Sequence, residues 1–248
     1  LSVFRESVPK YHAMFIEKCM GGKETRLMGF GRAFHLALLE PERYASDVVV
    51  GPDLNKNSNA WKDWKAKHQD KLILDEDESS RIQRMLASVN RHPDAKKLLQ
   101  EPGDAEVALR WLHDKTDIWC KCRIDYLHHQ PKILDLKSCS DPNPVEFSRS
   151  CGMLDYQCQA AFYIDAVYEL TGVRPDFIHI AVGMQPPHEC IVYQLDQEAI
   201  DLGRAMNETT LLRLKDCRDS DVWTSPYASG ILKIGLPRWV FNRLPVAG

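Results

Sequence analysis

Cys120-Lys-Cys-Arg-Ile-Asp125 and Ile133-Leu-Asp-Leu-Lys137 are the two stretches that decide the fold, and they follow each other closely in the chain. In both, apolar residues alternate with charged ones, as in strands that bury one face. The alternation predicts that Asp135 and Lys137 share one face of the second strand. If the two strands pair, Asp125 joins them, and two carboxylates and an ammonium meet at one edge of a sheet.

These charges suit metal-dependent hydrolysis of a phosphodiester bond. Carboxylate oxygens are the ligands that Mg²⁺ prefers, and an ammonium beside them can orient a water or offset charge on a phosphate. Lys121 and Arg123 share the face of Asp125. The alternative is a solvated ion pair between Asp135 and Lys137. Because these charges interrupt an apolar strand, a metal or an ion network would have to offset their burial.

Flanking segments supply the rest of a sheet and its helices. Residues 106–111 and 118–126 are β-branched or aromatic-rich and are separated by a turn-like stretch, which predicts a hairpin. Strands are also predicted at 132–138, 177–182 and 190–195, and helices at 155–170 and 197–216.

The first hundred residues are expected to be mostly helical. Apolar residues recur at helical spacing from Leu27 to Leu38, before Pro41, and again from Ile82 to Val89. A polar loop at 51–59 and a short helix at 61–67 are expected between them. We therefore predict one α/β domain over residues 1–248. It would comprise a helical part (1–100), a core (101–220) and a C-terminal tail without clear periodicity (221–248).

Composition and charge narrow the functional classes. The 248 residues are 44% hydrophobic and 27% charged, as in ordinary folded proteins. The net charge of −3 means that any nucleic-acid site must be a local basic patch. No run approaches the ~20 apolar residues of a membrane span. The start lacks both an initiator Met and the pattern of a signal peptide, so we expect a trimmed chain from a cytoplasmic protein.

The cysteines are expected to be buried free thiols rather than disulfides, since eight of them occur in a long chain without a secretion signal. Cys120 and Cys122, with the nearby histidines, suggest zinc, but one intervening residue is the wrong spacing for a zinc finger. No Gly-rich phosphate-binding loop occurs, which argues against an ATP-driven motor.

Other side chains are candidates for the same site. Gln159 and Tyr163 are four residues apart, so they lie on one face of a predicted helix. His35 follows Arg32 by about one turn, and this pair could face a phosphate. Glu106 begins a strand and is a candidate carboxylate for a second metal, although an exposed acid is the default interpretation. Taken singly, Tyr163 and His35 are more often structural residues.

Five segments in the same order resemble the PD-(D/E)xK nuclease superfamily, in the branch that includes the RecB nuclease domain and phage exonucleases. Within that branch the chain is most similar to the catalytic domain of the exodeoxyribonuclease VIII (RecE) type. The segments are Gly31-Arg-Ala-Phe-His-Leu-Ala-Leu-Leu-Glu-Pro41, Cys120-Lys-Cys-Arg-Ile-Asp125, Ile133-Leu-Asp-Leu-Lys137, Gln159-Ala-Ala-Phe-Tyr163 and Leu236-Pro-Arg-Trp239.

The resemblance implies a restriction-endonuclease-like α/β fold, with a central mixed sheet flanked by helices. It also implies a Mg²⁺-dependent exonuclease, with Mn²⁺ possible and one or two ions per site. Such an enzyme degrades linear double-stranded DNA 5′-to-3′ to 5′-mononucleotides and leaves 3′ tails for recombination. By the resemblance, the metal ligands are His35, Asp125, Asp135 and the carbonyl of Leu136, while Lys137 assists the attacking water.

The resemblance extends to the remaining residues and to partners. Gln159 and Tyr163 match the helical motif that shapes the site and contacts DNA. The duplex is expected to enter a groove whose basic residues include Arg32, Lys121 and Arg123. Two departures are Ile124, in place of a proline, and Asp135, in place of a longer Glu. A bacterial or phage origin, a toroidal homo-oligomer and a single-strand annealing partner of the RecT type are also implied.

Three alternatives stay open at this point. The chain could be another nuclease of the superfamily, acting on single strands or as an endonuclease. It could be a non-catalytic DNA-binding module of the same fold, or a zinc-stabilised structural protein. Relatives with an iron–sulfur cluster carry three clustered cysteines near the C-terminus, where this chain has Cys190 and Cys217, so a cluster is not expected.

Overall fold

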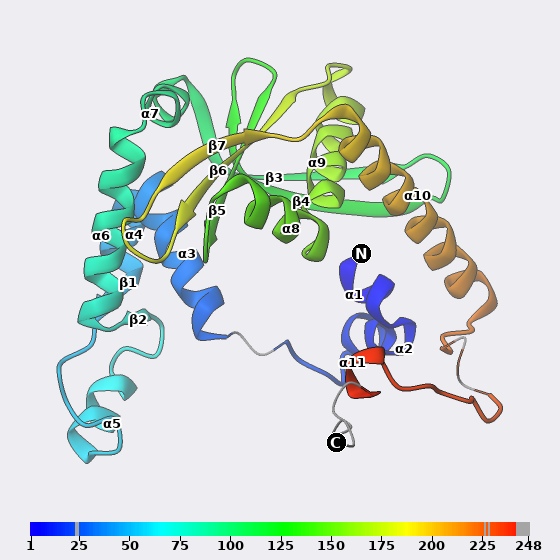
Figure 1. The fold of residues 1–248 in the computed structure, drawn as a ribbon, viewed down its shortest axis with the longest axis horizontal. Coiled ribbons are helices and arrows are strands. Elements are labelled where there is room, and N and C mark those ends of the chain that lie inside the picture. Colours follow the sequence, from blue (N-terminus) through cyan, green and yellow to red (C-terminus); the bar gives the residue numbers. More distant parts are fainter. Residues whose placement is uncertain (23–24, 226, 228, 242–248) are drawn as a thin grey trace, which may run out of the picture. The chain divides into compact units, whose positions relative to one another are not determined.

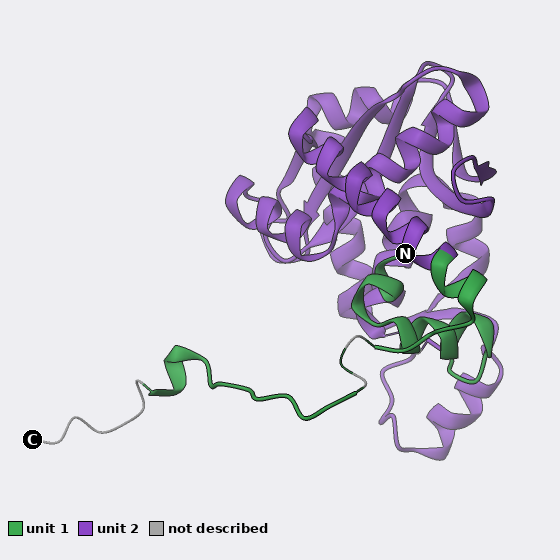
Figure 2. Ribbon diagram, turned by 90° about the vertical axis from the view of Figure 1, so that its right-hand side faces the viewer, with its two compact units in different colours: residues 1–21, 216–248 green, residues 22–215 purple. Residues whose placement is uncertain are grey.

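The computed structural model describes residues 1–22, 25–225, 227 and 229–241. The chain forms two compact units, residues 1–21 with 216–248, and residues 22–215 (Figure 2). The smaller unit contains α1 (Ser2–Glu6), α2 (Val8–Tyr11), a π-helical turn (His12–Ile16) and α11 (Arg238–Phe241). In the predicted tail 221–248, residues 226, 228 and 242–248 lie outside the described residues. The single domain stays a prediction.

The larger unit begins with helices, as the sequence predicts. They are α3 (Arg26–Leu39), α4 (Pro41–Asp47), α5 (Asn59–Ala66), α6 (Glu76–Arg91) and α7 (Pro93–Gln100). Helix α6 starts with a capping box, in which Asp75 accepts from the Glu78 amide and Glu78 accepts from the Asp75 amide. Pro41 separates α3 from α4 because it cannot continue the hydrogen bonding of α3.

A short parallel pair joins α4 to α6. Strand β1 (Val48–Val50) pairs with β2 (Leu72–Leu74), and residues 51–71, which include α5, connect the two. The sequence analysis missed this pair, because strands of three residues are too short to show a period.

The main sheet has the order β3-β4-β5-β6-β7 (Figure 1). Its strands are β3 (Gly103–His113), β4 (Ile118–His128), β5 (Lys132–Cys139), β6 (Asp176–Gly183) and β7 (Cys190–Gln194). Strands β5 and β6 are parallel, and the other neighbours are antiparallel. The connection between β5 and β6 runs through α8 (Pro144–Met153) and α9 (Tyr156–Thr171), and α10 (Gln197–Ser220) follows β7.

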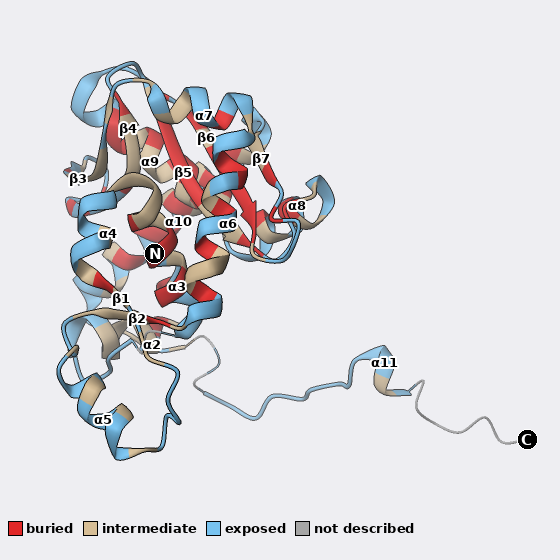
Figure 3. Cartoon of the chain, turned by 90° about the vertical axis from the view of Figure 1, so that its left-hand side faces the viewer, coloured by how far each residue is buried: buried red, intermediate tan, exposed pale blue. Residues whose placement is uncertain are grey.

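Helices cover both faces of this sheet, and side chains that alternate along β5 separate two cores. Leu134 and Leu136 pack with α3 and α6. Ile133 packs with α9 on the opposite face. The central strands are accordingly buried along much of their length (Figure 3). The predicted mixed sheet flanked by helices is confirmed.

The alternation along β4 is interrupted at Asp125. Ile124 and Leu127 both belong to the α9 core, whereas Tyr126 packs with the α3 core. The β3–β4 register pairs Ala105 with Tyr126 and Val107 with Ile124, which leaves Glu106 and Asp125 between these pairs, and Glu106 has a φ of 54° in the left-handed region. Strands β4 and β5 pair at Tyr126 with Leu134, close to their connecting turn. This irregularity lies where Glu106 and Asp125 fall outside the regular pairing of β3 with β4.

All eight cysteines are free thiols. Cys19 is exposed, whereas the prediction places all the thiols in buried positions. Among the residues described, no helix combines the length and the hydropathy that crossing a bilayer requires.

Candidate active site

A pocket of about 930 Å³ in the larger unit is lined mostly by charged and polar side chains. Helix α3 forms one side, the strands β3 to β5 carry the acids and the ammonium, and α9 closes the pocket. The residues from these elements include Arg32, His35, Glu106, Arg123, Asp125, Lys137 and Tyr163. Segments that lie about a hundred residues apart in the chain therefore meet in one pocket.

Three side chains in this pocket have the spacing of a metal site. One ligand atom each from His35, Glu106 and Asp125 lies within 4.8 Å of the others. The His35 Nδ1 atom is 3.5 Å from Asp125 Oδ2. Burial lowers the pKa of His35 and so favours the neutral imidazole that binds metals. Two carboxylates and one imidazole fit a hard or borderline divalent ion such as Mg²⁺ or Mn²⁺.

Glu106 is positioned by its unusual backbone. The left-handed φ turns it away from the regular path of β3, and its Oε2 lies 2.8 Å from Arg123 Nε. Burial raises the pKa of Glu106, although Arg123 opposes this. The default interpretation of Glu106 as an exposed acid is wrong, since the residue is half-buried beside His35 and Asp125.

Asp125 is tied to the next strand. Its Oδ2 accepts a hydrogen bond from the Leu136 backbone amide at 2.8 Å. Burial, and then the negative charge of Asp135, raise the pKa of Asp125 to about 8. The two acids thus influence each other across the gap between β4 and β5. A bound cation would relieve this repulsion and favour the charged carboxylate.

Asp135 is fully buried, at 0% exposure, and protein donors surround its carboxylate. Oδ1 accepts from Gln159 Nε2 at 2.8 Å, and Oδ2 accepts from His179 Nδ1 at 3.0 Å. Lys137 Nζ lies 2.7 Å from the same Oδ2. Burial alone would raise the pKa of Asp135, but Lys137 and His179 outweigh burial and hold the pKa below its usual range. Asp135 is therefore charged and fixed in place.

The Lys137 ammonium is held from several sides. It donates to Gln159 Oε1 at 2.8 Å, and it lies 4.5 Å from the centre of the Tyr156 ring. Burial would lower the pKa of Lys137, but Asp135 outweighs burial and raises it. Gln159 in turn donates to the Tyr163 hydroxyl at 3.2 Å. Gln159 thus contacts both the lysine and the acid, and Tyr163 contacts Gln159, while the role of this pair in shaping the site and contacting DNA stays a prediction.

Two predicted assignments differ from this geometry. Asp135 is not part of the described metal triad, in which Glu106 takes its place. The role of Asp135 as a metal ligand stays a prediction. Arg32 and Arg123 line the pocket, whereas Lys121 lies farther along β4, opposite Arg110 in the register, so a contact from Lys121 to DNA also stays a prediction.

Sequence reasoning missed His179 and Tyr156. His179 pairs with Asp135 in the parallel β5–β6 register, and its ring packs against Phe147 and Phe177. The only available signal was a histidine in the middle of an apolar strand, His179 between two isoleucines. Tyr156 is the first residue of α9, and no spacing rule connects it to Lys137.

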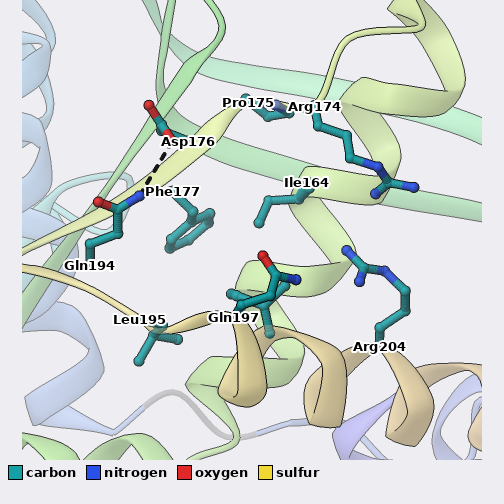
Figure 4. Close-up of a pocket in the computed structure, with 10 residues that line it drawn as sticks. Ile164, Arg174, Pro175, Asp176, Phe177, Gln194, Leu195, Gln197 and Arg204 are labelled. Atoms are coloured by element: carbon teal, nitrogen blue, oxygen red, sulfur yellow. Dashed lines mark hydrogen bonds between the residues drawn. The ribbon is translucent and has the colours of Figure 1, made fainter.

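A second pocket, of about 260 Å³, lies beside the start of β6 (Figure 4). Arg174 and Arg204 line it, and both donate to Asp165, which neutralises part of their charge. Figure 4 also shows Gln194 bonded to Asp176, at 3.3 Å. Among the residues that the structure describes, the lining of this second pocket includes one carboxylate and no histidine or cysteine. The second pocket therefore lacks the group of metal-ligating side chains found in the first pocket.

Comparison with known proteins assigns the chain to a family. No curated protein matches the chain. A solved structure described as "Putative exonuclease", from Eubacterium rectale, aligns with a TM-score of 0.59 at 14% identity, over 94% of this chain and 85% of that one. A second one, SSO0001, aligns with a TM-score of 0.32 at 13% identity, over 84% of this chain and 98% of that one, and carries no weight.

The sequence itself gives the more direct assignment. Residues 3–231 match the family described as "PDDEXK-like domain of unknown function (DUF3799)". The recognition of the PD-(D/E)xK superfamily is thereby confirmed, and the narrower similarity to the RecE type stays a prediction. Since the match covers nearly the whole chain, this protein is a member of the PDDEXK-like domain family.

Proposed function

We propose that the protein is a divalent-metal-dependent nuclease that hydrolyses phosphodiester bonds of DNA. The observation that carries this proposal is the meeting of His35, Glu106 and Asp125 beside the ammonium of Lys137 in one pocket. A purely structural ion pair would require only Asp135 and Lys137. It would not explain why His35, Glu106 and Asp125 also meet in the same pocket.

The triad would hold the cation. When bound there, a divalent ion supplies charge for the phosphate and a more acidic water. Asp125 and Glu106 provide carboxylate oxygens, and the neutral His35 provides a nitrogen lone pair. The hydrogen bond from the Leu136 amide fixes the Asp125 carboxylate. This metal ligand is therefore already oriented before the ion binds.

Lys137 would act on the reacting groups. Its ammonium lines the pocket, and Asp135 and Gln159 fix its position. A cation held there can orient the attacking water and offset charge that develops on the phosphate. Arg32 and Arg123 at the pocket would bind the flanking phosphates of the strand.

We further propose linear double-stranded DNA as the substrate, degraded 5′-to-3′ to 5′-mononucleotides with Mg²⁺ as the ion. The support is the RecE-type pattern of the five segments, together with the similarity in fold to the Eubacterium rectale protein that is described as a putative exonuclease. A cytoplasmic location, a ring-shaped homo-oligomer and a RecT-type annealing partner for the 3′ tails belong to the same proposal.

The test is digestion of end-labelled linear duplex DNA with Mg²⁺ present or chelated. We expect metal-dependent release of mononucleotides from 5′ ends by the native protein. Lys137→Ala should lose at least ~10²-fold in rate, the cost of removing a transition-state charge. Lys132→Ala, on the same strand but paired with Glu101, is the matched control and should keep its activity.

The outcomes separate the possible nucleases. Full activity of folded Lys137→Ala would refute the assignment of Lys137 and the mechanism with it. Cleavage of circular duplex would show an endonuclease, and digestion of single strands alone would show a single-strand exonuclease. Duplex binding without any cleavage would show a non-catalytic module.

A further inference from the structure

A lysine-rich segment projects next to the candidate active site. Residues 51–71, called the arm below, extend from the end of β1, form α5 and return at β2 (Figure 1). None of the residues of α5 is buried, and the arm is drawn almost entirely as exposed or intermediate (Figure 3). The arm therefore adds little to the core of the fold, so packing does not account for its many lysines.

The charge of the arm is opposite to that of the chain. It carries five lysines and three aspartates, a formal net charge of +2 in a chain of −3. Lys62 and Lys65 are three residues apart and lie on the same side of α5. Neither has an acidic residue three or four positions away, and no ion pair to either occurs among the described residues. A merely solvated helix face would more often pair such charges along the helix.

Aromatic rings hold the arm in shape. The Trp61 ring packs against Gly51, where a Cβ atom would meet the ring at 2.8 Å. Trp61 stacks on Trp64 with ring centroids 5.4 Å apart, and Trp64 stacks on His68 at 4.2 Å. The His68 Nδ1 atom also lies 2.8 Å from the Trp64 carbonyl. The lysines are thus presented on a preformed support, which lowers the entropy cost of binding.

The base of the arm is continuous with the pocket. Asp70, which belongs to the arm, lines the pocket together with Asp47 and Leu72 on either side. The same pocket holds His35 and Asp125. A polymer with a phosphate at the triad would therefore pass close to the arm as it leaves the pocket.

We propose that the arm binds the phosphodiester backbone of the DNA that enters the pocket, with Lys62 and Lys65 as the principal contacts. This inference rests on the proposed nuclease function. Charge complementarity identifies the ligand, since phosphate contacts by lysines supply most of the sequence-independent affinity for DNA. The contacted phosphates belong either to the duplex or to a separated single strand, which share this chemistry.

The test compares two double charge reversals in the full chain. Lys62→Glu with Lys65→Glu alters the arm. Lys96→Glu with Lys97→Glu makes the same change of charge on exposed positions of α7, at the opposite end of the larger unit (Figure 1). Binding of labelled duplex and single-stranded oligonucleotides is measured with chelator over a salt series, and cleavage is measured with Mg²⁺.

For the arm variant we expect weaker binding by about tenfold or more, and a salt dependence reduced by about one unit of slope for each lysine. The KM for DNA should rise while kcat at saturation stays within about twofold of the native value. A loss confined to single strands assigns the contact to a separated strand. Lys62→Gln with Lys65→Gln should give about half of the effect, and this milder pair carries the test if the Glu pair does not fold.

Equal affinities and salt slopes for the arm and α7 variants would overturn the inference. The two proposals fail separately. If the native protein cleaves DNA but the arm variant keeps the native KM, the proposed role of the arm is wrong and the proposed nuclease function stands. If the arm variant loses DNA binding but neither the native protein nor the variants cleave DNA, the role of the arm in DNA binding stands and the nuclease function is wrong.

Discussion

The Asp125 carboxylate accepts a hydrogen bond from the Leu136 amide at 2.8 Å, beyond the point where their strands β4 and β5 pair. The side chain takes the place of a backbone acceptor and so satisfies a buried donor. The Leu136 backbone also acts on His35, because it opposes the lowering of the His35 pKa by burial. One peptide segment of β5 therefore orients Asp125 and influences His35.

Glu106→Gln should weaken divalent-metal binding by about tenfold or more, because one charged ligand becomes neutral while the side chain keeps its shape. Calorimetric titration with Mg²⁺ or Mn²⁺ measures this. Asp104→Asn removes an exposed acid two residues earlier on β3 and is the control. Equal metal affinity for both variants would exclude Glu106 from the site.

His179→Leu should slow DNA cleavage by about tenfold or more with little change in KM, because Asp135 loses a donor that orients it. His179→Asn can replace the Nδ1 donor with its amide and should recover most of the rate. Single-turnover cleavage measures both variants. Equal losses for Asn and Leu would mean that His179 serves packing alone.

The stability of the metal-free protein should fall as the pH rises from about 4 to about 8 through the contribution of Asp125. In that window the native Asp125, with its raised pKa, holds a proton that the unfolded chain has released. Asp135 acts in the opposite sense, and its contribution is lost only when the solution is acidified below its ordinary pKa. Urea unfolding with chelator, compared between native protein and Asp125→Asn, measures the difference. Parallel pH profiles would contradict the raised pKa.

Gly203→Ala should destabilise the protein by about 1–3 kcal/mol, the usual cost of overpacking. A Cβ atom at Gly203 would collide with the backbone carbonyl of Gln157, where α10 meets α9. Gly152→Ala, in α8 with open space around it, is the matched control and should be neutral or gain up to about 1 kcal/mol. Urea denaturation gives both values, and a stable Gly203→Ala would show that α10 can shift away.

Much of the fold follows from periodicity. The hairpin, β5, α9 and α10 were predicted nearly to their observed ends, because each is long enough to show its period. The same alternation placed Leu134 and Leu136 opposite Asp135. Short elements such as β1, β2 and α4 escaped prediction, since tertiary packing rather than local pattern stabilises them.

The site was predicted where residues are close in sequence and less well where they are not. Asp125, Asp135 and Lys137 lie within one hairpin, so strand geometry brings them together. The contact of Glu106 with this group depends on a left-handed φ, and that of His179 on a parallel register after a long crossover. Neither feature leaves a signal in a single sequence.

The β4–β5 hairpin also bears on the order in which the site assembles during folding. Its turn is short, so closing it costs little chain entropy and can precede the docking of distant helices. From the moment the hairpin forms, Asp125 and Asp135 are neighbours, and the compensating Lys137 comes with them on the same strand. The nascent chain thus never has to bring two uncompensated negative charges together from afar; His35 and Gln159 complete a centre whose charges are already partly balanced.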